Sequence, residues 1–148
     1  MTVKYADVEQ GSEIPVKSYR VTRADLVKYA GASGDFNPIH WNERFARSVG
    51  LPGVIAHGMF TMAEAGKFVT EWAGDPGAVL EFSVRFSAVV PVPDDTDPPL
   101  GGTTGGATIE VSGKVREKLA DNKVAVDLVA TCGGDKVLTR ARAVVRLP

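Results

Sequence analysis

Residues 29–42 read Tyr-Ala-Gly-Ala-Ser-Gly-Asp-Phe-Asn-Pro-Ile-His-Trp-Asn, and the predicted fold is organised around this stretch. Pro38 has a fixed φ angle and disfavours the helical conformation at Asn37, so a helix that enters from the N-terminal side must end here. Asp35 and His40 stand on either side of this bend. A carboxylate and an imidazole are common partners for proton transfer near neutral pH. The stretch therefore predicts a tight bend carrying a candidate acid–base pair, although ordinary turn and capping roles explain the same residues.

The chain before this bend is predicted to form a strand and a helix. Rough alternation of apolar and polar residues over 14–21 favours a short edge strand, which begins near Pro15. Thr22 and Asp25 have the spacing of a capping box, in which the side chain of each residue accepts a hydrogen bond from the backbone N–H of the other. Apolar residues then recur at helical spacing, and Gly31 is predicted to end this helix.

Two more helices are predicted after the bend. Asn42 is placed to cap a short helix that closes at Gly50. The longest helical pattern runs over residues 57–72 and contains few charged side chains. A helix with so few charges usually lies against a sheet, so we expect this one to be largely buried.

The remainder of the chain has the pattern of strands separated by turns. Apolar and polar residues alternate over 79–90, after which residues 93–106, rich in Asp, Pro and Gly, are predicted to form a flexible loop. Three further strands joined by short turns are predicted over 107–117, 123–132 and 136–147. A long buried helix followed by antiparallel strands indicates an α+β fold, and a curved antiparallel sheet wrapped around that helix satisfies the pattern.

Length and composition exclude several classes of protein. A chain of 148 residues fits a single domain, 1–148, with a substantial core. A net charge of -1 gives no electrostatic reason to expect nucleic acid or an anionic membrane as a partner. Cys132 is the single cysteine, which excludes an internal disulfide and suits a reducing compartment. Without a recognisable signal peptide or an apolar run of ~20 residues, a soluble cytoplasmic protein is expected.

Two blocks of sequence carry a resemblance to a known family. The first is Gly34-Asp35-Phe36-Asn37-Pro38-Ile39-His40, and the second is Ile55-Ala56-His57-Gly58-Met59. In this order and at this distance they resemble the motifs of the MaoC-like (R)-specific enoyl hydratases and dehydratases. The resemblance implies the hot-dog fold. It also implies a hydro-lyase that adds water to a trans-2-enoyl thioester or removes it from a (3R)-3-hydroxyacyl thioester.

Other stretches narrow this resemblance. Residues 27–41, 75–78 and 86–93 are similar to the catalytic subunits of heterodimeric actinobacterial (3R)-hydroxyacyl dehydratases that act on acyl carrier protein in fatty acid biosynthesis. The similarity implies a dehydration step in chain elongation. It also implies a hot-dog dimer, in which the second protomer is either a copy of this chain or a different, non-catalytic hot-dog subunit.

The resemblance also implies roles for individual residues. Asp35 and His40 are the expected catalytic residues, Asn37 supports them, and the backbone N–H of Gly58 binds the thioester oxygen as it becomes an oxyanion. Unpaired N–H groups at the start of a helix suit that last role, because they carry the positive end of the helix dipole. The role of His57 stays open between local structure or substrate positioning and proton transfer.

A metal site, a hot-dog thioesterase and a non-catalytic subunit are the alternatives to this interpretation. The spacing of the two histidines and Asp35 matches no common metal motif, so no metal is predicted. No other cofactor is predicted either, since the substrate would arrive as a thioester of coenzyme A or acyl carrier protein. A hot-dog thioesterase would use a carboxylate on the long helix, where Glu64 lies. A non-catalytic acyl-binding or scaffolding subunit is disfavoured by the complete set of Asp35, Asn37 and His40.

Overall fold

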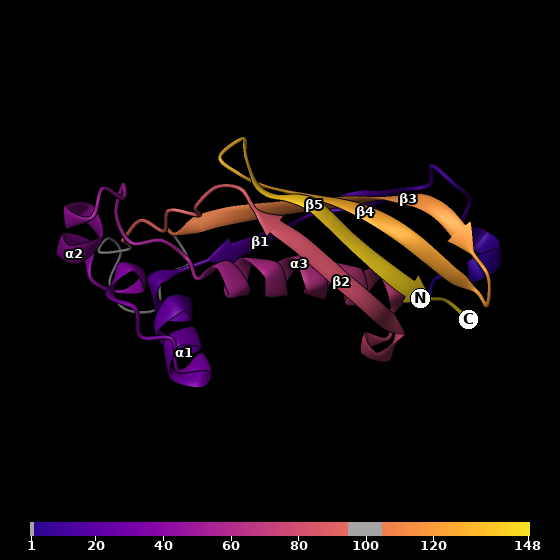
Figure 1. Cartoon of the computed structure of the whole chain (residues 1–148), viewed down its shortest axis with the longest axis horizontal. Coiled ribbons are helices and arrows are strands. Elements are labelled where there is room, and N and C mark those ends of the chain that lie inside the picture. Colours follow the sequence, from indigo (N-terminus) through magenta and orange to yellow (C-terminus); the bar gives the residue numbers. More distant parts are fainter. Residues whose placement is uncertain (1, 95–104) are drawn as a thin grey trace.

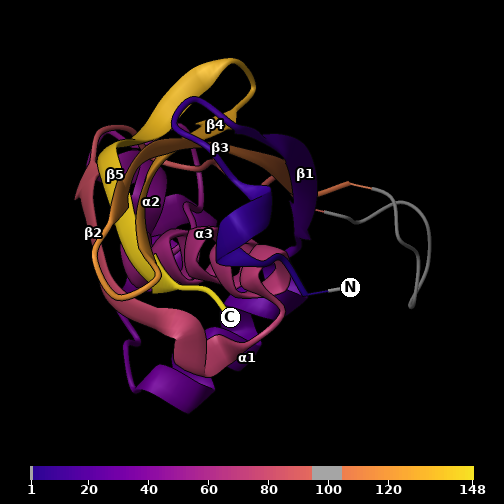
Figure 2. The ribbon, with the colours of Figure 1, turned by 90° about the vertical axis from the view of Figure 1, so that its right-hand side faces the viewer.

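The computed structural model describes residues 2–94 and 105–148. In these two parts of the chain, five strands form one antiparallel sheet in the order β1-β3-β4-β5-β2. The strands are β1 (Glu13–Val21), β2 (Val79–Phe86), β3 (Ala107–Leu119), β4 (Lys123–Cys132) and β5 (Asp135–Arg146). The sheet curves around one long helix, as the end-on view of Figure 2 shows. This arrangement confirms the predicted α+β hot-dog fold.

The helices follow the capping signals of the sequence, with one exception. They are α1 (Arg23–Ser33), α2 (Glu43–Ser48) and α3 (Gly58–Ala73), and the short 3-10 turns are η1 (Tyr5–Asp7), η2 (Pro38–His40) and η3 (Pro76–Ala78). The capping box of Thr22 and Asp25 is present. The prediction that Gly31 ends the first helix is wrong, because the helix continues to Ser33 and ends at Gly34, which has a φ of 76°. Gly34 is the glycine that takes the left-handed conformation typical of a helix end.

The strand predictions hold except at the end of β2. β2 stops at Phe86, whereas alternation predicted a strand as far as residue 90. Beyond it the chain leaves β5 and bonds the segment before α3, since Ala56 donates to the Val90 carbonyl and Val92 donates to the Val54 carbonyl. The alternation of apolar and polar residues continues to residue 90 because Val90 is buried as well. Its neighbour is the segment before α3, and the alternation alone does not show which segment pairs with it. Most of the predicted loop at 93–106 lies outside the described residues.

The centre of the core is the contact between α3 and the concave face of the sheet. Phe68 and Val69 of α3 are fully buried. A Cβ on Gly113 of β3 would lie 3.2 Å from the Phe68 ring, so glycine permits the close approach of helix and sheet at this point. Full burial of a Phe or Val side chain stabilises a fold by roughly 1.5–3 kcal/mol. This packing fixes the N-terminal end of α3 at the end of the sheet where α1 and α2 lie (Figure 1). Among the helices described, none combines the length and the apolar character needed to cross a bilayer.

Glu64 is a destabilising feature of α3. Its Oε2 atom is buried, with no hydrogen-bond partner in the described structure. Burial raises the pKa of this carboxyl group above its ordinary value. The folded state therefore binds a proton here more tightly than the unfolded state does, and the associated stability is lost as the pH rises through the raised pKa.

Replacement of Glu64 by Gln is expected to raise the melting temperature at neutral pH by about 2–4 °C per kcal/mol gained. The gain should disappear below the pKa of the unfolded carboxyl, where the wild-type residue is protonated in both states. Thermal unfolding at several pH values measures this. Glu71→Gln is the matched control on the same helix. A hydrogen bond from Lys17 lowers the pKa of Glu71, so this change should destabilise the protein at neutral pH. A lower melting temperature for Glu64→Gln at neutral pH would contradict the assignment.

Candidate active site

The bend between α1 and η2 is held by hydrogen bonds from its own polar side chains. The Ser33 hydroxyl accepts from the Asp35 N–H at 3.1 Å, and Asp35 Oδ1 accepts from the Asn37 N–H at 3.1 Å. Asn37 Oδ1 in turn accepts from the Ile39 N–H at 3.2 Å. These consecutive turns fix the backbone on both sides of Pro38. The side chain of Asn37 thus bonds the backbone of η2, and its expected support of Asp35 and His40 stays a prediction.

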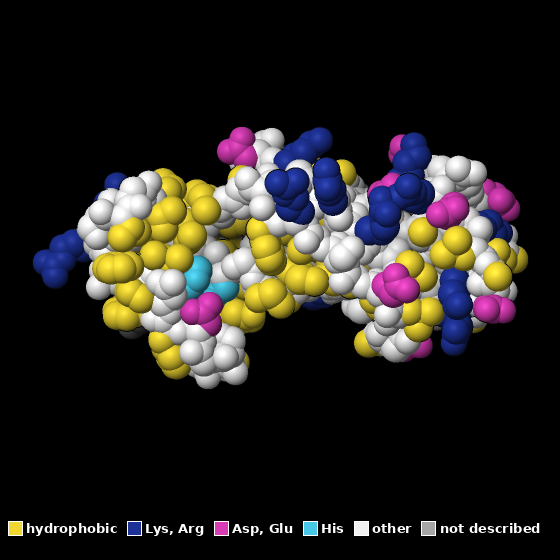
Figure 3. All heavy atoms as spheres, in the orientation of Figure 1, with side chains coloured by type: hydrophobic (Ala, Val, Ile, Leu, Met, Phe, Trp, Pro, Cys, Tyr) yellow, Lys and Arg dark blue, Asp and Glu magenta, His cyan; other side chains and the backbone are white. Residues whose placement is uncertain are grey.

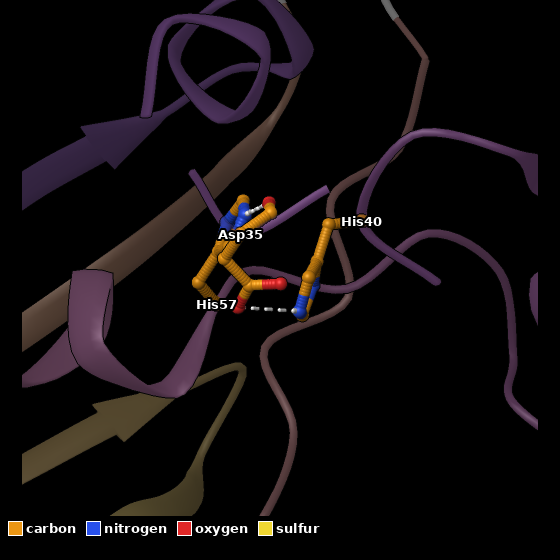
Figure 4. A group of neighbouring side chains, drawn as sticks. All are labelled: Asp35, His40 and His57. Carbon is orange, nitrogen blue, oxygen red and sulfur yellow. Dashed lines mark hydrogen bonds and ion pairs between the residues drawn. The ribbon is translucent and has the colours of Figure 1, made fainter. Parts of the chain in front are cut away.

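Asp35 and His40 face each other across a short gap (Figure 4). His40 Nε2 lies 3.9 Å from Asp35 Oδ2. On the other side of the ring, His40 Nδ1 lies 2.7 Å from the Ile55 carbonyl. Because a carbonyl only accepts, Nδ1 carries the proton, and in the neutral ring Nε2, the nitrogen that faces Asp35, is left as an acceptor. A separation of 3.9 Å is too long for a direct hydrogen bond, and a water or substrate hydroxyl can bridge the two groups.

His57, the residue that precedes α3, is the third member of this cluster. Its Nε2 lies 3.1 Å from the backbone carbonyl of Asp35. Its ring stacks on the His40 ring with centroids 3.8 Å apart and planes inclined by 23°. Burial lowers the pKa of His57, which favours the neutral imidazole. In Figure 3 the histidine and acidic side chains of this group are visible between hydrophobic side chains, although both histidines are buried.

A pocket beside His40 reaches the start of α3. Its volume is ≈ 470 Å³, and its lining is mostly apolar. His40 and Gly58 both line it, together with Ile39, Ile55, Ala56, Thr61, Phe86, Ser87, Ala88, Val89, Val90 and Val137. The hydrogen bonds between described residues include none from the Gly58 N–H, as expected for the first residue of a helix. The structure thus brings Gly58 and His40 to one mostly apolar cavity.

Sequence reasoning missed part of this lining. Thr61 is buried one helical turn after Gly58. The period of the helix places both residues on the same side, so helical spacing from Gly58 could have predicted Thr61 in the lining. Phe86 packs its ring against Gly58, where an added Cβ would lie 3.3 Å away. Val137 lies in β5 and reaches the pocket because β5 pairs with β2. No local sequence pattern predicts that pairing.

The cluster also has the composition of a metal site. Asp35, His40 and His57 each offer one ligand atom, and these atoms lie within 4.8 Å of one another. A metal ion lies along the lone pairs of its imidazole ligands at about 2.0–2.1 Å for zinc. The two rings are stacked, and each ring already directs one nitrogen at a backbone carbonyl. A metal bound by both rings would have to lie in both ring planes, and the planes of rings stacked with centroids 3.8 Å apart do not meet near the nitrogens, so the donors fit hydrogen bonding better than metal binding.

Glu64, the carboxylate that a thioesterase would use, does not belong to this pocket. Gly58 and Thr61 are the residues of α3 in the lining. Glu64 lies farther along α3, where Asp25 and Glu71 are among the charges that affect it. The structure therefore separates this carboxylate from His40.

Comparison with known proteins identifies the family. The family described as "MaoC like domain" matches residues 7–131. The chain belongs to the MaoC-like domain family. A relative named 3-hydroxybutyryl-CoA dehydratase, from Methylorubrum extorquens, is 31% identical over 147 residues, which are 97% of this chain and 83% of the relative.

Two further similarities involve longer proteins. The 3-hydroxyacyl-thioester dehydratase X of Mycobacterium tuberculosis is 44% identical over 79 residues, which are 53% of this chain and 27% of that protein. A solved structure titled "MaoC-like dehydratase" superposes with a TM-score of 0.89 at 41% identity, over 99% of this chain and 43% of that one. This MaoC-like chain thus spans less than half the length of these two relatives.

Proposed function

We propose that this MaoC-like chain is a hydro-lyase of fatty acid metabolism that interconverts (3R)-3-hydroxyacyl and trans-2-enoyl thioesters. The observation that carries the proposal is the gap of 3.9 Å between Asp35 Oδ2 and His40 Nε2, with His40 at the wall of an apolar pocket. The names of the relatives support it, since they include a 3-hydroxybutyryl-CoA dehydratase and a 3-hydroxyacyl-thioester dehydratase.

The reaction needs a proton moved at oxygen, a proton moved at the α-carbon, and stabilisation of the thioester oxygen. A water or 3-hydroxyl between Asp35 and His40 contacts a carboxylate oxygen on one side and an imidazole nitrogen on the other. One of these groups handles the proton at oxygen and the other handles the proton at carbon, and each positioned group contributes ~100- to 10,000-fold. The Gly58 N–H at the positive end of α3 binds the oxyanion.

The proposed chemistry uses protein side chains alone, without a metal or a bound cofactor. The acyl group arrives as a thioester of coenzyme A or acyl carrier protein, and the apolar lining of the pocket receives its carbon chain. We assign the enzyme to the dehydration step of fatty acid chain elongation in the cytoplasm.

Incubation of the purified chain with crotonyl-CoA and with a longer trans-2-enoyl-CoA separates the candidate functions. Water addition, measured as loss of the enoyl absorbance and formation of the 3-hydroxyacyl product, supports the proposal. Release of free thiol without hydration indicates a thioesterase. An unchanged substrate with a folded chain indicates a non-catalytic acyl-binding subunit.

The edges of the sheet provide a surface for a partner hot-dog protomer. An unpaired edge strand presents N–H and C=O groups to any chain that can pair with it. At the β2 edge, exposed apolar side chains include Leu80, Phe86 and Val89, and Met59 at the start of α3 is exposed too. Phe86 and Val89 also line the pocket, so a protomer docked there would help to enclose the acyl chain. We propose a dimer through β2, with either a copy of this chain or a non-catalytic hot-dog subunit.

A charge on the β2 edge is expected to weaken this dimer. Leu80→Glu places a carboxylate on this edge, and Val16→Glu is the matched control at an exposed apolar position of β1, at the opposite edge of the sheet. We expect light scattering to give a dimeric mass for the wild type and for Val16→Glu, and a monomeric mass for Leu80→Glu. A fully active wild-type monomer would contradict the dimer. A fully active homodimer would support dimerisation and remove the need for a different subunit.

A further inference from the structure

His57 touches both members of the Asp35–His40 pair, each through a different interaction. Its Nε2 lies 3.1 Å from the Asp35 carbonyl, and its ring stacks on His40 with centroids 3.8 Å apart (Figure 4). Only 1% of the residue is exposed. The pocket is lined by its neighbours Ala56 and Gly58 but not by His57 itself. Any effect of His57 on a substrate is therefore indirect, and Asp35 and His40 are the proposed catalytic residues that its ring contacts.

The contacts of the ring decide its protonation. The Asp35 carbonyl only accepts, so Nε2 carries the proton and donates it. Nδ1 is buried and lacks a hydrogen-bond partner in the part of the chain that the structure describes. A second proton at Nδ1 would place an unpaired positive charge in the interior, directly against the His40 ring. Burial accordingly lowers the pKa of His57. The ring is therefore neutral: Nε2 donates a hydrogen bond, and the lone pair of Nδ1 accepts none from the described residues.

A side chain that only filled space would not need a buried nitrogen without a hydrogen-bond partner, such as Nδ1. A buried polar atom without a partner costs free energy, whereas an apolar ring of the same size avoids the cost. Tyr29, whose ring centroid lies 4.7 Å from that of His57, and Phe60 already form an aromatic group at this place. Among the described residues, the one hydrogen bond of the His57 ring is its N–H to the Asp35 carbonyl, which places the function of this ring at Asp35.

We propose that His57 is a positioning residue: its single N–H fixes the peptide unit of Asp35, and thereby the carboxylate, relative to the His40 ring on which His57 stacks. The inference rests on the proposed hydratase and dehydratase function, because it concerns the geometry of that catalytic pair. Misplacement of a reacting group by about 1 Å costs on the order of 100-fold in rate. Loss of the N–H is therefore expected to lower kcat while leaving KM nearly unchanged.

Two substitutions separate the hydrogen bond from the ring. His57→Phe keeps a flat ring for stacking on His40 but removes the N–H. His57→Gln loses the ring but places an amide N–H at the same number of bonds from Cα as Nε2. Glu64→Gln is the control, since it alters the other buried unpartnered polar atom, away from the pocket. kcat and KM for a trans-2-enoyl-CoA, and the melting temperature, are measured for each variant and for the wild type.

We expect His57→Phe to melt at or above the wild-type temperature and to lose about 10- to 100-fold in kcat. We expect His57→Gln to recover most of that loss and Glu64→Gln to keep the wild-type kcat. Wild-type kcat in a folded His57→Phe variant would overturn the inference, and so would a His57→Gln variant as impaired as His57→Phe. An inactive wild type in the same assay would instead refute the proposed function, so the two failures are distinguishable.

Discussion

Asp35→Asn is expected to lower kcat by ~100-fold or more without unfolding the protein. The amide removes the carboxylate that faces His40 Nε2 across 3.9 Å. Its side-chain oxygen can still accept from the Asn37 N–H, as Asp35 Oδ1 does now, so the bend should persist. Steady-state kinetics with a trans-2-enoyl-CoA, together with the melting temperature, measure the effect.

His40→Asn makes the same test from the other side of the pair. The amide nitrogen of Asn lies where Nδ1 is, so it can keep the hydrogen bond to the Ile55 carbonyl while losing the function of Nε2. We expect a comparable loss of kcat. The double variant should lose little more than either single variant, because residues that act as a unit are not additive.

Asp75→Asn is the control for both changes. Asp75 forms the same kind of turn, accepting from the Gly77 N–H at 2.8 Å, beyond the far end of α3. Its replacement should leave kcat unchanged. Near-normal turnover by a folded Asp35→Asn variant would refute the assigned mechanism.

Gly58→Pro is expected to cost ~100- to 1,000-fold in kcat, the usual effect of removing one oxyanion donor. Proline is tolerated at the first position of a helix, and His57 already has the extended conformation that precedes proline, with φ −57° and ψ 137°. The change therefore deletes the N–H at the wall of the pocket while α3 can still form.

Gly58→Ala separates the lost donor from the added bulk. Alanine also places a Cβ about where it would meet the Phe86 ring at 3.3 Å, but it retains the N–H. We expect the alanine variant to keep much more activity than the proline variant. Equal losses in both would show that crowding by Phe86 is responsible, and full activity in a folded Gly58→Pro variant would place the thioester oxygen elsewhere.

Much of the fold could be predicted because local chemistry decides it. The capping box at Thr22 and the side-chain cap at Asn42 require only neighbouring residues, and the sequence patterns of β3, β4 and β5 match their observed bounds closely. Gly31 and Gly34 carry the same local signal for a helix end, and the actual end depends on which residue takes the left-handed conformation. The end of β2 depended on a partner distant in sequence, the segment before α3.

In the site, too, the predictable features depend on neighbouring residues, and the missed ones depend on residues distant in sequence. Asp35 and His40 lie on one rigid bend, so their proximity follows from a short stretch of sequence. The stacking of His57 on His40 joins two segments that are far apart in the chain, and no spacing rule predicts it. The contribution of Val137 to the pocket likewise requires the pairing of β2 with β5.

The most direct measurement of the central assignment is dehydration of (3R)-3-hydroxybutyryl-CoA by the wild type and by Asp35→Asn under identical conditions. The wild type is expected to form the trans-2-enoyl thioester and to leave the (3S) isomer unchanged. The folded Asp35→Asn protein is expected to react at about one hundredth of that rate or less. Equal rates for the two proteins, or release of free coenzyme A in place of the enoyl thioester, would contradict the assignment of Asp35 and His40 as the catalytic pair of a hydro-lyase.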